Sequence, residues 1–146
     1  PQVKFYNIAD TLRKFVHIFA CGELMLIKKK VFDSVLPVPP CLAEDSYILF
    51  KALELGYKAH FCKEAYVTTE RTSNADEEEA YKLRTTLGIY QALKYTRPPI
   101  WIRTFYILLP IAAPLLALAG EDGKAWMRGI MKALYAILTR YHPTKF

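Results

Sequence analysis

Glycine and cysteine are both scarce in this chain, and each shortage excludes a class of protein. Six glycines in 146 residues are too few for a collagen-like repeat or a glycine-rich linker. The three cysteines, Cys21, Cys41 and Cys62, form an odd set without a close pair. This spacing argues against a disulfide framework and against a zinc site. We expect reduced, buried thiols in a cytosolic environment.

The N-terminal end lacks both a methionine and a signal peptide. The chain begins at Pro1, and no basic stretch followed by an apolar run and a small-residue cleavage site opens it. A start in the middle of a pattern suggests a piece of a longer protein. The sequence has no internal repeat, and its 53% hydrophobic residues exclude a disordered polar tail. The length is that of one ordinary domain.

Acidic residues are outnumbered by basic ones, 14 to 20, which gives a net charge of +6. This balance favours an anionic partner: nucleic acid, acidic lipid headgroups or phosphorylated substrates. The basic residues are scattered along the chain and flank an apolar run instead of interleaving with aromatic residues. We therefore expect no nucleic-acid partner.

One long apolar run stands out, because residues 100–120 contain a single charge, Arg103. A helix of that length measures about 31 Å, close to the thickness of a bilayer core. The run predicts a transmembrane or re-entrant helix, with a buried helix of a soluble core as the alternative. Basic Lys94 and Arg97 precede it and acidic Glu121 follows it, so the N-terminal side is predicted to be cytosolic.

These features divide the chain into two parts. Residues 97–146 form a membrane-associated helical region, in which residues 125–142 have the apolar spacing and basic side of an amphipathic surface helix. Residues 1–96 form a soluble α/β piece. Its predicted helices cover residues 10–19, 43–56 and 73–94, the last with Ser73 as its cap. Its predicted strands cover residues 22–27, 57–62 and 65–69.

Two groups of side chains in the α/β piece can carry chemistry. Glu44 and Asp45 are adjacent carboxylates at the start of a predicted helix, where one of them can act as a general base. The alternative is that Asp45 or Ser46 simply caps the helix. Lys82 and Arg84 lie on the helix before the apolar run, after the pair Glu70-Arg71. Such cations suit a pyrophosphate or an acidic headgroup, and a solvated surface is the alternative. Both interpretations also apply to the lysines at 28–30.

The order of these motifs resembles the C-terminal half of family-2 glycosyltransferases. The chain runs from GELMLIKKKVF through a proline loop to AEDSYILFKALELGYK, then to AYVTTE, the basic helix YKLRTTLG and the apolar run. The resemblance covers roughly residues 20–120. It implies a GT-A-like mixed sheet with flanking helices, followed by the apolar and amphipathic helices. The first part, residues 1–96, would then be the acceptor side of the catalytic domain.

The resemblance also implies roles for particular residues. Asp45 is then the catalytic base with Glu44 beside it, and Arg84, Lys82 and Glu70 contact the diphosphate or the acceptor. The reaction is an inverting transfer of a sugar from a nucleotide-sugar to a lipid-linked or membrane-proximal saccharide acceptor. A divalent cation, Mg²⁺ or Mn²⁺, is expected for the whole enzyme, with its ligands outside this chain.

The sequence departs from that family at two points. The Q-x-x-R-W motif of processive synthases is replaced by YKLRT at residues 81–85, which favours a single transfer over polymerisation. The D-x-D metal motif of the family's N-terminal half does not occur in the chain. A function of another class stays open: a non-catalytic membrane-attached module that binds acidic lipid or a partner protein, in which the acidic pair is only a cap.

Overall fold

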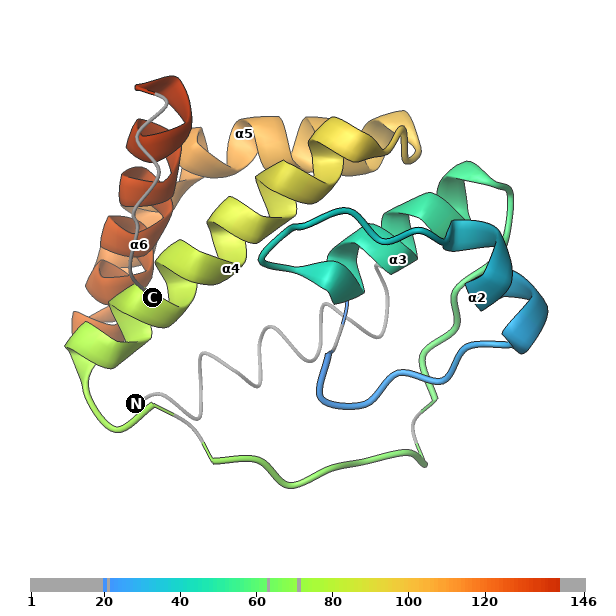
Figure 1. The fold of residues 1–146 in the computed structure, drawn as a ribbon. Helices are drawn as coiled ribbons and strands as arrows, with labels where there is room; N and C mark the ends of the chain where they lie inside the picture. Colours follow the sequence, from blue (N-terminus) through green and yellow to red (C-terminus); the bar gives the residue numbers. More distant parts are fainter. Residues whose placement is uncertain (1–19, 21, 63, 71, 140–146) are drawn as a thin grey trace.

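The computed structural model describes residues 20, 22–62, 64–70 and 72–139, and helices dominate this part of the chain (Figure 1). The predicted helix at residues 10–19 lies outside it. The helices are α2 (Lys29–Val35), α3 (Glu44–Glu54), α4 (Ala75–Tyr95), α5 (Ile100–Leu116) and α6 (Glu121–Leu138). A short 3-10 turn, η1 (Ala117–Ala119), joins α5 to α6.

Helix α3 begins and ends where the sequence signals predict. Glu44 and Asp45 lie in its first turn, where the helix dipole favours carboxylates. Gly56 follows the helix with φ +83°, a left-handed conformation that glycine adopts without a Cβ clash. The amide of Gly56 donates to the Leu53 carbonyl and that of Tyr57 to the Ala52 carbonyl. These two bonds satisfy carbonyls that the helix end leaves open.

The N-cap of helix α4 lies one residue later than predicted. Asn74, not Ser73, is the N-cap, and its side chain accepts a hydrogen bond of 2.9 Å from the Glu77 amide. Ser73 contributes from outside the helix, because its amide donates to the Glu77 carboxylate at 2.8 Å. The acidic residues of the first turn further stabilise this end through the helix dipole.

Helix α4 is central to the packing, because α3 and α6 both pack against it (Figure 1). After α4 the chain turns back, so that α5 runs in the opposite direction and leads into α6. The core between α3, α4 and α5 contains Phe50, Ala92, Ile102 and Tyr106, all at most 1% exposed. The rings of Phe50 and Tyr106 meet edge to face, with centroids 5.9 Å apart.

The predicted α/β fold with a GT-A-like mixed sheet is wrong for the described residues, none of which belongs to a strand. A buried strand was expected at residues 22–27, yet Leu26 is 99% exposed. Residues 57–62 and 65–69 are extended and mostly exposed. A strand needs a neighbour to pair its backbone groups, whereas exposed extended backbone binds water instead. The apolar side chains that form the core come from helices.

The helices predicted for the C-terminal region are confirmed, but one of them packs elsewhere than predicted. Residues Ile100–Ala119 form a helical segment long and apolar enough to cross a membrane, and 22% of its most apolar stretch is buried. The small and apolar side of α6, expected on a membrane surface, packs against α4 instead. Gly129 allows this packing, because a Cβ there would lie 2.7 Å from the Glu79 carbonyl oxygen.

Replacing Gly88 by alanine is expected to destabilise the fold. A Cβ at this position would lie 2.7 Å from the backbone nitrogen of Ala43, so α3 would have to move away from α4. Overpacking of this kind costs about 1–3 kcal/mol, against a gain of about 1 kcal/mol in helix propensity. Urea unfolding followed by circular dichroism should therefore show a lower midpoint for Gly88→Ala. An unchanged or higher midpoint would contradict the close approach of the two helices.

Candidate functional site

Four of the residues that the sequence singles out line one cavity of about 580 Å³. Glu44 and Asp45 come from the first turn of α3, and Lys82 and Arg84 come from the middle of α4. The two helices are held together at Gly88, which has no Cβ to keep them apart, as described above. The cavity therefore brings an acidic pair and a basic pair together from segments far apart in the sequence.

A side-chain hydrogen bond strengthens this contact at the edge of the site. The Gln91 side-chain oxygen accepts a hydrogen bond of 2.9 Å from the Leu42 amide. Leu42 lies two residues before α3, so this bond fixes the chain just where the helix begins. The position of the acidic pair relative to α4 is thus set by backbone contacts and by one amide side chain.

The Asp45 side chain is half-buried at the wall of the cavity. One carboxylate oxygen accepts a hydrogen bond of 2.7 Å from the Ser46 amide, and the other faces Gly22. The N-cap of α3 is Ala43, which makes no side-chain cap bond. Asp45 is thus not the N-cap residue, but it accepts a first-turn amide and so keeps a structural role at the start of α3.

The thiol of Cys41, which lies near the acidic pair, is unreactive at neutral pH. Burial raises the pKa of Cys41, and the carboxylates of Glu44 and Asp45 raise it further, outweighing a backbone hydrogen bond from Ala43. Cys41 therefore stays protonated at neutral pH and is a poor nucleophile. Cys41 and Cys62 are free, as expected, but Cys62 is exposed where a buried thiol was predicted. Cys21 lies outside the described residues.

Both cations of the cavity lie against aromatic rings. The Lys82 ammonium is 3.8 Å from the centroid of the Trp126 ring, and the Arg84 guanidinium carbon is 5.6 Å from that of Tyr81. Both rings also line the cavity. A cation over an aromatic face gains about 0.5–2 kcal/mol, depending on exposure, and its charged head is restrained. The basic side of the cavity is thus partly preorganised.

Trp126 is the site residue that the sequence analysis missed, because its spacing assigns it to the apolar side of an amphipathic helix. Its indole nitrogen donates a hydrogen bond of 2.5 Å to Glu78, a carboxylate with 0% exposure. The Thr72 hydroxyl donates to the same carboxylate. The sequence gives only a weak signal for this contact. The first turn of α4 has several acidic residues, and not all of them are required to stabilise the helix end.

The other sequence candidates lie elsewhere. Glu70 is exposed on the extended segment before α4 and does not line the cavity. Arg71 is outside the described residues. Lys28 is exposed just before α2, and Lys29 pairs with Asp33 one turn later at 2.7 Å. The structure places this part of the lysine run on a solvated surface helix.

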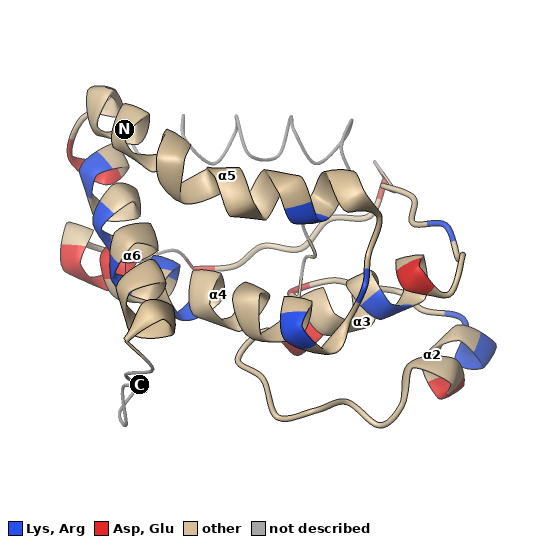
Figure 2. Cartoon of the chain, turned by 90° about the horizontal axis from the view of Figure 1, so that it is seen from above, with Lys and Arg blue, Asp and Glu red and all other residues tan. Residues whose placement is uncertain are grey.

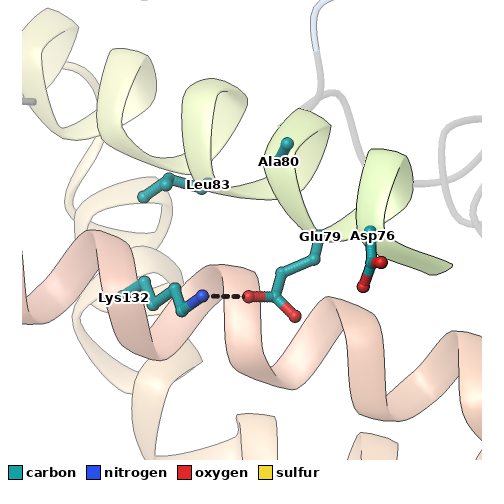
Figure 3. Close-up of a pocket in the computed structure, with 5 residues that line it drawn as sticks. All are labelled: Asp76, Glu79, Ala80, Leu83 and Lys132. Carbon is teal, nitrogen blue, oxygen red and sulfur yellow. Dashed lines mark ion pairs between the residues drawn. The ribbon is translucent and has the colours of Figure 1, made fainter. Parts of the chain in front are cut away.

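A second cavity, of about 310 Å³, lies between α4 and α6 and is shown in Figure 3. Glu79 points into it from α4 and pairs with Lys132 and Arg128 of α6. Burial raises the pKa of Glu79, but the hydrogen bonds from Lys132 and Arg128 outweigh it and hold the pKa below its ordinary value. The ion pairs join α6 to α4, so this cavity has a structural role.

No metal site is evident in the described ranges, because they contain no group of three or more histidine, cysteine or acidic side chains able to hold an ion. The chain matched no family model, no curated protein and no solved structure. Chemistry is therefore expected at the larger cavity. Its carboxylate can accept a proton from a hydroxyl, and its two cations can bind a phosphate group.

Binding of pyrophosphate tests the basic side of the cavity. The chain has two tryptophans, so Trp101→Phe leaves Trp126 as the reporter. Pyrophosphate should change its emission in a saturable manner. Lys82→Gln or Arg84→Gln should weaken binding by about tenfold, since each removes a charge-assisted contact. Lys58→Gln, which removes an exposed cation outside the cavity, is the control. An equal loss in the control would contradict the site.

The pKa of Glu79 predicts an acid sensitivity of the contact between α4 and α6. A carboxyl group with a lowered pKa in the folded state stabilises the fold above its unfolded pKa, about 4.3, and this contribution is lost as pH falls through the folded pKa. Glu79→Gln should reduce stability by about 1–2 kcal/mol at pH 7 and flatten the acid decline. Urea unfolding between pH 7 and pH 3 measures both effects, with Glu64→Gln as control. A decline as steep as in the original chain would exclude the pair as its source.

Proposed function

We propose that this chain carries the acceptor side of an inverting sugar transferase that works at a membrane. The observation that supports this most is the cavity in which Glu44 and Asp45 face the side of α4 that carries Lys82 and Arg84. The same residues occur in the motif order that resembles family-2 glycosyltransferases. The proposal rests on this cavity and not on a sheet, because the fold is helical.

Asp45 is the base in the proposed reaction. Its carboxylate accepts the proton of an acceptor hydroxyl as that oxygen bonds to the anomeric carbon of the sugar. The bond from this carbon to the leaving nucleoside diphosphate breaks, and its electron pair stays on the diphosphate oxygen. Attack from the opposite face inverts the configuration. Glu44 lies exposed beside Asp45 at the mouth of the cavity.

Arg84 and Lys82 supply the positive charge in this scheme. Negative charge gathers on the diphosphate as the bond breaks, and cations held at fixed positions stabilise it without reorganising. The Trp126 and Tyr81 rings restrain the two cations, as described above. Both cations equally suit a phosphate carried by the acceptor. Glu70, which lies outside the cavity, has no part in the scheme.

The donor is a nucleotide-sugar, and its contacts are not assigned to residues of this chain. We also expect Mg²⁺ or Mn²⁺ in the complete enzyme. The described residues do not fit a metal site, and none of them acts as a metal ligand in the proposed reaction.

The proximity of the cavity to α5 supports an acceptor at the membrane. Tyr106 of α5 lines the cavity, so the site and the apolar helix share a side chain. In the proposed reaction, an acceptor that is lipid-linked or membrane-proximal would lie close to α5 when it meets Asp45. We expect the catalytic part on the cytosolic side, where the anionic leaflet would attract the basic residues that precede the helix.

The proposal is tested by Asp45→Asn in the complete gene product. Membranes that contain it are supplied with a panel of radiolabelled nucleotide-sugars, and transfer to extracted lipid and saccharide is counted. Loss of the base should reduce transfer by at least about a hundredfold while nucleotide-sugar binding is kept. Asp33→Asn, in an exposed pair of α2, is the matched control and should transfer normally.

Two results would overturn the proposal. Normal transfer by Asp45→Asn would exclude this residue as the base. Phosphate or acidic lipid binding without transfer from any donor would instead favour the non-catalytic membrane module.

A further inference from the structure

Helix α5 is apolar on both of its sides, although only one side is covered. Ile102, Tyr106, Pro110 and Ala113 are buried toward the rest of the molecule. On the other side an uncovered row, here called the α5 stripe, recurs at helical spacing. It consists of Ile100 (77% exposed), Ile107 (66%), Leu108 (50%), Ile111 (74%) and Leu115 (68%), and it continues into η1 with Leu118 (86%). An apolar surface of this length on a folded protein marks an interaction site.

The covered side of α5 is firmly attached. Tyr106 is 1% exposed and packs against Phe50 of α3, and its carbonyl accepts a hydrogen bond of 2.6 Å from the Tyr90 hydroxyl of α4. A helix that crossed a bilayer in this position would take α3 and α4 with it. Their acidic and basic side chains, including Lys82 and Glu79, would then enter hydrocarbon at high cost. The packing is thus incompatible with α5 crossing the membrane as a lone helix.

The surroundings of the stripe fit a lipid surface. Lys94, Arg97 and Arg103 are exposed at the end of α5 nearest α4's C-terminus, beside the exposed rings of Tyr95 and Trp101. Figure 2 shows basic residues at this end of α5 and no charge along the rest of the helix. Cations attract an anionic membrane, and tyrosine and tryptophan favour the headgroup level. A protein partner would not require this combination.

We propose that α5 lies along the surface of an anionic bilayer, with the α5 stripe in the outer part of the acyl region. Lys94, Arg97 and Arg103 contact headgroup phosphates at one end of the helix. The other side of α5 stays packed on α3 and α4, so the helix is half-embedded and does not cross. This surface does not depend on the proposed transfer reaction.

Depth measurements separate a helix that lies flat from one that crosses. Trp126→Phe leaves Trp101 near the basic end, whereas Trp101→Phe with Trp126→Phe and Leu108→Trp places the only tryptophan at the middle of α5. Emission is quenched by lipids brominated near the headgroup or near the chain end, in vesicles of phosphatidylglycerol and phosphatidylcholine. A flat helix gives shallow quenching at both positions. A crossing helix gives deep quenching at position 108, which would overturn the proposal.

Charge variants test the attraction to the anionic surface. Arg103→Glu should weaken binding to these vesicles by at least about fivefold. Lys30→Glu makes the same change in charge on α2, which packs against α3, and should alter binding by less than twofold. Added salt should weaken binding, and vesicles of phosphatidylcholine alone should bind poorly. Circular dichroism checks that each variant is folded.

Two outcomes would overturn the docking surface. The first is a folded chain that does not sediment with anionic vesicles at low salt. The second is a concentration-dependent dimer that protects Trp101 from aqueous quenchers while vesicles leave it unaffected. That result would assign the α5 stripe to a second copy of the chain.

Discussion

The positions of α3 and α6 depend on close contacts that both helices make with α4. Gly88 brings the start of α3 onto α4, and Gly129 brings α6 onto it from the other direction. Backbone meets backbone at both points, so the helices cannot be shifted without a clash or a gap. These contacts form the cavity, because they bring the start of α3 against the middle of α4. The two segments are about forty residues apart in the chain.

The same packing explains why the cavity has an ordered basic side. Glu78 is taken out of water when α6 covers α4, and the indole nitrogen of Trp126 and the Thr72 hydroxyl satisfy it. A buried carboxylate without partners would be costly, so the ring is held in one position. Lys82 then lies over a fixed surface. Stability of the helix pair and geometry of the site are therefore coupled.

Local signals in the sequence predicted the helices better than the fold. Gly56 ends α3 as predicted, the long apolar run located α5, and the apolar spacing located α6. The strands were predicted from one short apolar run and from β-prone composition, neither of which can tell an extended, hydrated segment from a paired one. Glu44, Asp45, Lys82 and Arg84 were identified by residue type. Their meeting in one cavity, and the part played by Trp126, depend on packing between distant segments, for which the spacing of apolar residues carries no information.

The extended connection between α3 and α4 has a consequence for how the site is built. Residues 57–62 and 64–70 are largely exposed, and the acidic and basic sides of the cavity lie on opposite sides of this connection in the chain. Exposed extended backbone is the kind of segment that proteases cut. A single nick there would leave Asp45 and Arg84 on separate polypeptides, joined only by noncovalent contacts such as the bond from Leu42 to Gln91. The two pieces would be complementary halves of one site.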